Sequence, residues 1–234
     1  MNANSVDWQS ARKEIVRNAA SIGVAVAMYG VSFGALGTTT GLSIPQTMAL
    51  SLLMFTGASQ FTLVGTLASG GTAFTAVVAS WLMGTRNAAY SMRMTPILKT
   101  KSPGRLVAVQ LTIDESTAMG LAQDEQAFDG RASRLAFWAT GLSVYLLWNL
   151  ATFIGALSVS TIGDPKSFGL DAAIAAGLFA LVWPQIKSRI DLSVALGGAL
   201  IALALTPFVS PGIPVLAAAL VSIIVGWATG KQMP

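Results

Sequence analysis

Long runs of apolar residues without a charged side chain dominate the sequence. The four longest cover residues 18–85, 135–163, 172–186 and 192–230. Since a helix needs about 20 apolar residues to cross a bilayer, these runs have room for about six or seven crossings. We expect membrane-spanning helices at residues 18–37, 45–68, 72–94, 134–157, 170–186, 191–207 and 212–229. Strands of a membrane barrel would alternate polar and apolar residues. These runs do not alternate, so the pattern predicts an all-α polytopic membrane protein.

The composition supports a membrane location and narrows the chemistry. Of the 234 residues, 53% are hydrophobic and 10% are charged, whereas ordinary soluble domains carry about 25% charged residues. The chain has no cysteine and no histidine, which removes disulfides and the usual ligands of zinc and haem, so we expect no cofactor and no metal. Proton transfer near neutral pH must then use a carboxylate, lysine or tyrosine with a shifted pKa. Basic and aromatic residues are not interleaved as in nucleic-acid-binding proteins, so we do not expect nucleic acid as a partner.

Charged residues are sorted by sign along the chain, and this predicts its orientation. Residues 1–17 carry both signs and lack the features of a cleaved signal peptide. Five basic residues and no acid lie at positions 86–105, whereas the next five charges, Asp114 to Asp129, are all acidic. Because cytoplasmic loops are rich in Lys and Arg, we expect residues 1–17 to form a cytoplasmic tail, on the same side as the basic segment. The rest is predicted as one membrane domain over residues 18–230, with a polar connecting segment at about 95–133.

An even number of crossings must connect the tail to the basic segment, yet three apolar segments lie between them. The stretch MFTGASQFTLVG offers an explanation, because it places Gly57, Ser59 and Gln60 within apolar sequence. Glycine costs about 1 kcal/mol relative to alanine in a helix, and irregular backbone at membrane depth persists only where protein or a cavity surrounds it. We therefore predict a helix interrupted at residues 57–60. The alternative is that Gln60 only hydrogen-bonds a neighbouring helix, which contributes about 1 kcal/mol.

Two further patterns concern symmetry and packing. Residues 41–60 resemble residues 169–185, since both begin with Gly-Leu and end with a helix-disrupting residue followed by a glutamine. Repeated broken segments in two halves are typical of transporter sites, but runs of alanine and leucine also match by chance, and both interpretations stay open. Gly30 and Gly34 have the GxxxG spacing that is typical of close helix packing.

Three motifs resemble those of one family over most of residues 20–160. SFG at residues 32–34 looks like its opening motif, FTGASQF at 55–61 is similar to its aromatic-x-Gly-Ala-x-Gln-Phe motif, and DES at 114–116 resembles its Asp-Glu-Ser/Thr signature. The family is AzlC, the large subunits of branched-chain amino acid exporters, to which the YgaZ and BrnF proteins belong. One stretch departs from it: GTRN at residues 84–87 stands where the family usually has Asn-Leu-Arg-His. The arginine is kept and the histidine is not.

The resemblance implies a secondary transporter subunit, a multi-pass protein of the cell inner membrane that exports branched-chain or similar hydrophobic amino acids. It also implies coupling to protons and a small membrane partner of the AzlD type. A channel or pore-type subunit for a small solute is the alternative. An intramembrane enzyme is not expected, because no Asp pair or Ser/Lys motif lies within a predicted span.

An aliphatic amino acid is a zwitterion with an apolar side chain, so its site needs donors for the carboxylate, acceptors for the ammonium and dry walls. A helix broken at Gly57 supplies N–H groups at a half-helix N-terminus, where the dipole favours an anion. Freed carbonyls, with Ser59 and Gln60, would receive the ammonium, and phenylalanines would line the walls. The candidate substrate-binding residues are Phe55, Gly57, Ala58, Ser59, Gln60 and Phe61.

Three charged residues are candidates for coupling and gating. Asp114 and Glu115 are candidate proton carriers, since burial raises the pKa of a carboxyl group; alternatively, they neutralise the basic segment. They follow residues 106–113, whose pattern fits a strand as well as a short amphipathic helix. Arg86 is either a gating residue or an anchor at the membrane edge.

Overall fold

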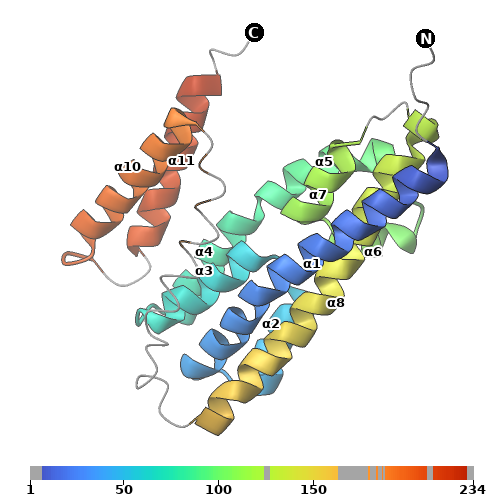
Figure 1. Ribbon diagram of the computed structural model, residues 1–234. Coiled ribbons are helices and arrows are strands. Elements are labelled where there is room, and N and C mark those ends of the chain that lie inside the picture. The colour runs from blue at the N-terminus through green and yellow to red at the C-terminus, as the bar shows by residue number, and fades with distance from the viewer. Residues whose placement is uncertain are drawn as a thin grey trace. The chain divides into compact units, whose positions relative to one another are not determined.

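The computed structural model describes residues 7–123, 127–162, 188–209 and 213–230, together with residues 179, 183 and 186. All regular secondary structure in these residues is helical (Figure 1), which confirms the predicted all-α fold. The elements are α1 (Trp8–Thr39), α2 (Ile44–Leu53), α3 (Gly57–Ala68), α4 (Ala73–Gly84), α5 (Arg86–Leu98), α6 (Gly104–Gln110), α7 (Asp114–Leu121), η1 (Ala127–Gly130), α8 (Arg131–Ile162), α10 (Arg189–Leu205) and α11 (Ile213–Gly230).

The helix boundaries follow the predicted spans, except that two spans in the first half of the chain are each divided. Each of α1, α8, α10 and α11 coincides with a predicted span, although α1 begins at Trp8 and so extends into the predicted tail. The predicted spans 45–68 and 72–94 are each divided into two shorter helices. Since α2 has 10 residues and α3 has 12, each reaches only about half of the roughly 30 Å hydrocarbon core. The predicted span 170–186 lies almost wholly outside the described residues, as does the second half of the suspected repeat.

Among the described residues, two helical segments are long and apolar enough to cross a membrane: Trp8–Thr39, which is α1, and Phe128–Val159, which includes most of α8. The total of six or seven crossings stays a prediction. The polar connecting segment contains α6 and α7, so residues 104–110 form a helix and not a strand.

The chain divides into two compact units. The first contains Met1–Gly57 and Gly84–Pro165, and the second contains Ala58–Met83 and Lys166–Pro234. The boundary between the units therefore falls at the first residue of α3. The expected tail and single membrane domain stay predictions.

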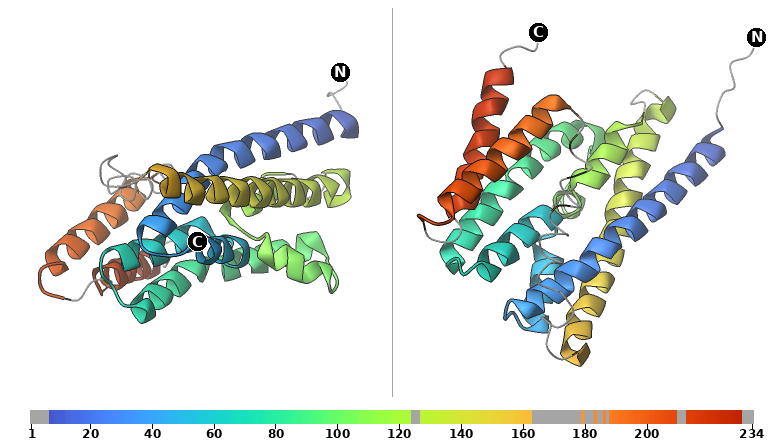
Figure 2. Two further views of the ribbon diagram at one scale, coloured as in Figure 1. Left: turned by 90° about the horizontal axis from the view of Figure 1, so that it is seen from below. Right: turned by 60° about the vertical axis from the view of Figure 1, so that its left-hand side comes forward.

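In the first unit, α1 and α8 lie side by side along much of their length (Figures 1 and 2). Glycines permit this close packing. A Cβ on Gly34 would collide with the carbonyl oxygen of Thr152, and one on Gly30 would lie 3.0 Å from the carbonyl oxygen of Trp148. The GxxxG spacing therefore serves helix packing, as predicted, and α8 is the packing partner.

Other helices pack on the α1–α8 pair or on each other within their own unit. α2 packs against both α1 and α8, and α7 packs against α8 and α5. In the second unit, α10 and α11 lie side by side (Figure 1). There, the Ser80 hydroxyl of α4 donates a hydrogen bond to the Ser59 carbonyl of α3, at 3.0 Å.

Candidate functional site

The chain leaves helical geometry between α2 and α3. α2 ends at Leu53 and α3 begins at Gly57, and Met54 between them has φ −103° and ψ 58°, outside the helical region. The predicted interruption is confirmed, but its position was wrong: residues 57–60 form the first turn of α3, and the break precedes them. The N–H groups of a first turn have no intrahelical partner, so the half-helix N-terminus expected at Gly57 is present.

Gly57 makes room for an aromatic ring and is not needed for an unusual backbone angle, since its φ is not positive. A Cβ on Gly57 would lie 3.3 Å from Cη2 of Trp148 in α8. The same indole stacks on Phe33 of α1, with ring centroids 6.1 Å apart and planes 23° apart. Both rings are buried. The SFG and FTGASQF motifs therefore meet on Trp148.

Side chains from α6 and α8 hold the end of α2. The Leu52 carbonyl accepts a hydrogen bond from Gln110 Nε2 at 2.8 Å and another from the Tyr145 hydroxyl at 3.3 Å. Two turns further along α8, the buried Thr152 hydroxyl accepts a hydrogen bond from Ser51 at 3.2 Å. The protein itself therefore uses the Leu52 carbonyl oxygen, and the expectation that freed carbonyls receive a substrate ammonium stays a prediction.

Phe55, in the break, is 6% exposed. Its ring meets the ring of Tyr145 edge to face, with centroids 4.9 Å apart and planes 80° apart, a favoured geometry for aromatic pairs. Phe55 therefore packs on an aromatic partner beside the break, and its place in a substrate site stays a prediction.

The first turn of α3 holds the other candidate substrate-binding residues. Ser59, Gln60 and Phe61 are buried, each at most 1% exposed, and Ala58 is partly buried. The Ser59 hydroxyl has no hydrogen-bond partner in the part of the chain that the structure describes. A buried hydroxyl without a partner is costly and is a reason to look for a ligand at this turn. Substrate binding by these residues stays a prediction.

A second polar cluster joins α5 to the DES signature at the start of α7. Asp114 forms an ion pair with Arg86 at 2.6 Å, and its other carboxylate oxygen accepts a hydrogen bond from the Tyr90 hydroxyl at 2.6 Å. The side chains of Arg86 and Asp114 are 32% and 29% exposed. Two of the three charged candidates are therefore partners, and Arg86 links two helices of the first unit.

The other two residues of the signature differ in their surroundings. Ser116 fixes the start of α7, because its hydroxyl donates to the Leu111 carbonyl at 2.6 Å and accepts from the Ile113 N–H at 3.1 Å. Glu115 is partly buried. Burial raises the pKa of the Glu115 carboxyl and the charge of Asp114 adds to this, against smaller opposing effects of its own backbone N–H and Arg86. α7 lies outside the two segments long enough to cross a membrane, and a raised pKa suits a proton carrier.

Sequence reasoning missed Gln110, Tyr145 and Trp148, which support the break. Tyr145 and Trp148 stand three residues apart in α8 and so lie on one face of the helix. That spacing of aromatic side chains within an apolar span was the available signal. Gln110 offered no signal, because its role depends on how α6 folds back toward α2.

The chain matches the family model described as "AzlC protein" over residues 21–162. This match covers more than half of the chain and includes the break, Trp148 and the Arg86–Asp114 pair. The chain belongs to the AzlC family. A protein of Archaeoglobus fulgidus is 29% identical over 201 residues, 84% of this chain and 85% of the relative, and its description reads "Uncharacterized membrane protein". No solved structure matches the chain. This AzlC protein is therefore a transporter-type membrane subunit.

Proposed function

We propose that this AzlC protein is a secondary transporter subunit that exports branched-chain or similar hydrophobic amino acids across the inner membrane, coupled to protons. The observation that carries the proposal is the interrupted helix at the family motif, where α3 begins beside the buried indole of Trp148. Discontinuous helices with exposed half-helix ends are typical of substrate sites in secondary transporters.

The charged end of an amino acid suits the first turn of α3. Its carboxylate would receive hydrogen bonds from the N–H groups that follow Gly57, where the helix dipole is worth about half a positive charge. Its ammonium would use the Ser59 hydroxyl, which is buried without a partner in the described residues, and the Gln60 side chain in the same turn. The Leu52 carbonyl has two donors already and is not assigned to the ligand.

The apolar end of the substrate needs a dry wall, and Phe55 and Trp148 supply one. Both are at most 6% exposed and carry no formal charge. Burying a valine, leucine or isoleucine side chain stabilises a complex by about 1.5–3 kcal/mol, enough to favour aliphatic over small polar amino acids. This supports the proposed substrate class without ranking its members.

Proton coupling is assigned to Glu115 and Asp114, because burial raises the pKa of the Glu115 carboxyl and the neighbouring Asp114 forms an ion pair with Arg86. Glu115 carries the raised pKa. Asp114 next to it connects this carboxyl to Arg86, because the Asp114–Arg86 ion pair links α7 to α5. In this proposal Arg86 acts as a gating residue through that pair.

Counterflow exchange tests the proposal. Proteoliposomes that contain this chain with its small AzlD-type partner, loaded with unlabelled leucine, should accumulate labelled leucine, and the rate should saturate with external leucine. Gln60→Ala should weaken leucine binding by about 1–3 kcal/mol, the usual cost of leaving a buried polar partner unsatisfied. A pore shows neither saturation nor trans-stimulation, so a linear, non-exchanging flux would favour the channel alternative and contradict the proposal.

The partner belongs to the same proposal. A small membrane protein of the AzlD type should co-purify with this chain when the two genes are expressed together, and transport should require both. Large apolar side chains lie exposed on several helices, including Met28 at 69% and Trp81 at 72%, and lipid or a partner can cover them. Full transport by the isolated chain would remove the partner from the account.

A further inference from the structure

A pocket lies in the first unit, between α5 and α6 and apart from the helix break. It has a volume of about 110 Å³, several times the roughly 10–15 Å³ that one water molecule needs. That volume is enough for a small polyatomic group. The lining residues are Ser91, Met94, Thr95, Leu98, Thr100, Arg105, Ala108, Val109 and Thr112.

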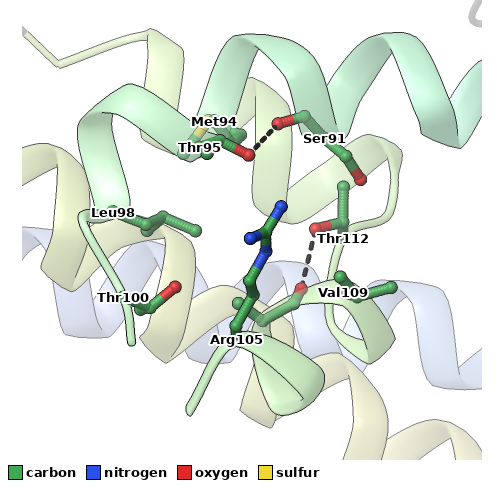
Figure 3. Close-up of a pocket in the computed structure, with 9 residues that line it drawn as sticks. Ser91, Met94, Thr95, Leu98, Thr100, Arg105, Val109 and Thr112 are labelled. Atoms are coloured by element: carbon green, nitrogen blue, oxygen red, sulfur yellow. Dashed lines mark hydrogen bonds between the residues drawn. The ribbon is translucent and has the colours of Figure 1, made fainter. Parts of the chain in front are cut away.

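The guanidinium group of Arg105 occupies the centre of this pocket (Figure 3), between Ser91 and Thr95 of α5 and Thr112. Its rim is rich in hydroxyls. Those of Thr95 and Thr112 donate to the carbonyls of Ser91 and Ala108, at 2.6 and 2.7 Å, so their lone pairs can hold the guanidinium. Within the described part of the chain, Arg105 has no acidic partner, and Ser91 and Thr100 have no partner for their hydroxyls.

The pocket therefore combines one cation with two hydroxyl donors and no carboxylate. An arginine fork matches the geometry of phosphate oxygens, and hydroxyl groups complete such a site. We propose that this pocket binds a phosphate group, held by Arg105 with Ser91 and Thr100. The proposal is independent of the substrate assigned to the helix break.

The outer surface of the pocket indicates where the phosphate group comes from. Leu106 and Val109 of α6 are 72% and 58% exposed, and Met92 of α5 is 72% exposed. Exposed Lys99 and Lys101 follow α5 directly. Apolar side chains next to basic ones are typical of a surface at the lipid headgroup level, and basic clusters attract anionic lipids. The phosphate of an anionic phospholipid is the source that this surface favours, and soluble phosphate is the other.

The test measures the melting temperature of the purified full chain in neutral detergent with three additions: phosphatidylglycerol, phosphatidylcholine and inorganic phosphate. Phosphatidylglycerol should raise the melting temperature more than phosphatidylcholine, and Arg105→Gln should weaken its binding at least about tenfold. Arg105→Lys should lose part of the effect, since it keeps the charge but not the fork. The matched control is Arg93→Gln, an exposed arginine of the same basic segment that does not line the pocket.

The variants separate the outcomes. A shift with inorganic phosphate that Arg105→Gln abolishes supports the phosphate site and names soluble phosphate as its source. If Arg93→Gln and Arg105→Gln weaken phosphatidylglycerol binding equally, diffuse electrostatic attraction explains the binding and the proposal is overturned. The absence of a melting-temperature shift with both phosphatidylglycerol and inorganic phosphate would also overturn it. Ser91→Ala provides a second, milder variant if Arg105→Gln does not fold, and it should also weaken phosphatidylglycerol binding.

Discussion

Gly57 lies directly against the indole of Trp148: a Cβ on this glycine would be 3.3 Å from Cη2 of the ring. The contact joins the first residue of α3 to the middle of α8. It therefore brings the glycine of the family motif onto an aromatic side chain of α8 within the first unit, and the proposed substrate site begins at this contact.

Gly57→Leu should abolish leucine export while the protein remains folded and inserted, because its side chain would displace Trp148 and block the approach to the α3 backbone. Gly57→Ala should reduce export less, since the ring must move by only a few tenths of an ångström. Efflux from cells loaded with leucine measures the rate, and the amount of protein in the membrane fraction controls for folding.

The matched control for this prediction is Gly104→Leu. A Cβ on Gly104 meets no atom within 4 Å, so this variant should export normally. Normal efflux in Gly57→Leu would separate the glycine from the transport route and contradict the proposed site.

The two hydrogen bonds to the Leu52 carbonyl should stabilise the break. Tyr145→Phe and Gln110→Ala each leave one donor in place and should each cost about 0.5–1.5 kcal/mol of unfolding free energy. The double variant should cost more than the sum, because the carbonyl then loses both donors. Thermal unfolding in detergent measures these changes. Tyr29→Phe is the control, since Tyr29 has no hydroxyl partner in the described residues; equal effects of Tyr145→Phe and Tyr29→Phe would disprove the role.

Much of this arrangement could be predicted from the sequence, and the exceptions have physical reasons. The uncharged runs predicted α1, α8, α10 and α11 because a long apolar helix follows from composition alone. The break was predicted near Gly57, but its position depends on contacts from α6 and α8, which local propensity does not contain. The pairing of Asp114 with Arg86 and Tyr90 could not be predicted from the sequence. Asp114 lies 28 positions after Arg86 and 24 after Tyr90, so these side chains meet only through the fold.

The Arg86–Asp114 pair should show a measurable coupling energy. Arg86→Gln and Asp114→Asn should each lower transport. In a double-mutant cycle on unfolding free energy, the pair should contribute about 1 kcal/mol, at the upper end of the range for partly exposed pairs. Additive effects of the two substitutions would show that the ion pair carries no energy of its own. Lys101→Gln, in the same basic segment and exposed, provides the control.

Glu115 should make the stability of the protein depend on pH. Its pKa is raised in the folded state, chiefly by burial, so above the ordinary glutamate value of about 4.3 the folded protein binds this proton more tightly than the unfolded chain does. Stability should therefore fall as pH rises from that value through the folded pKa. Glu115→Gln should remove this part of the slope, whereas Glu14→Gln, at an exposed position of α1, should not. Parallel curves for the wild type and Glu115→Gln would show that Glu115 does not titrate in this way.

The most direct test of the central claim is amide hydrogen exchange at residues 54–65 with and without leucine. Leucine should slow exchange of the N–H groups at residues 57–60, because these amides would bind its carboxylate. Exchange in α10, which has no buried residue, should stay unchanged and serves as the internal reference. Leucine binding that leaves residues 54–65 unprotected, with protection appearing elsewhere in the chain, would contradict the assignment of the substrate site to the broken helix.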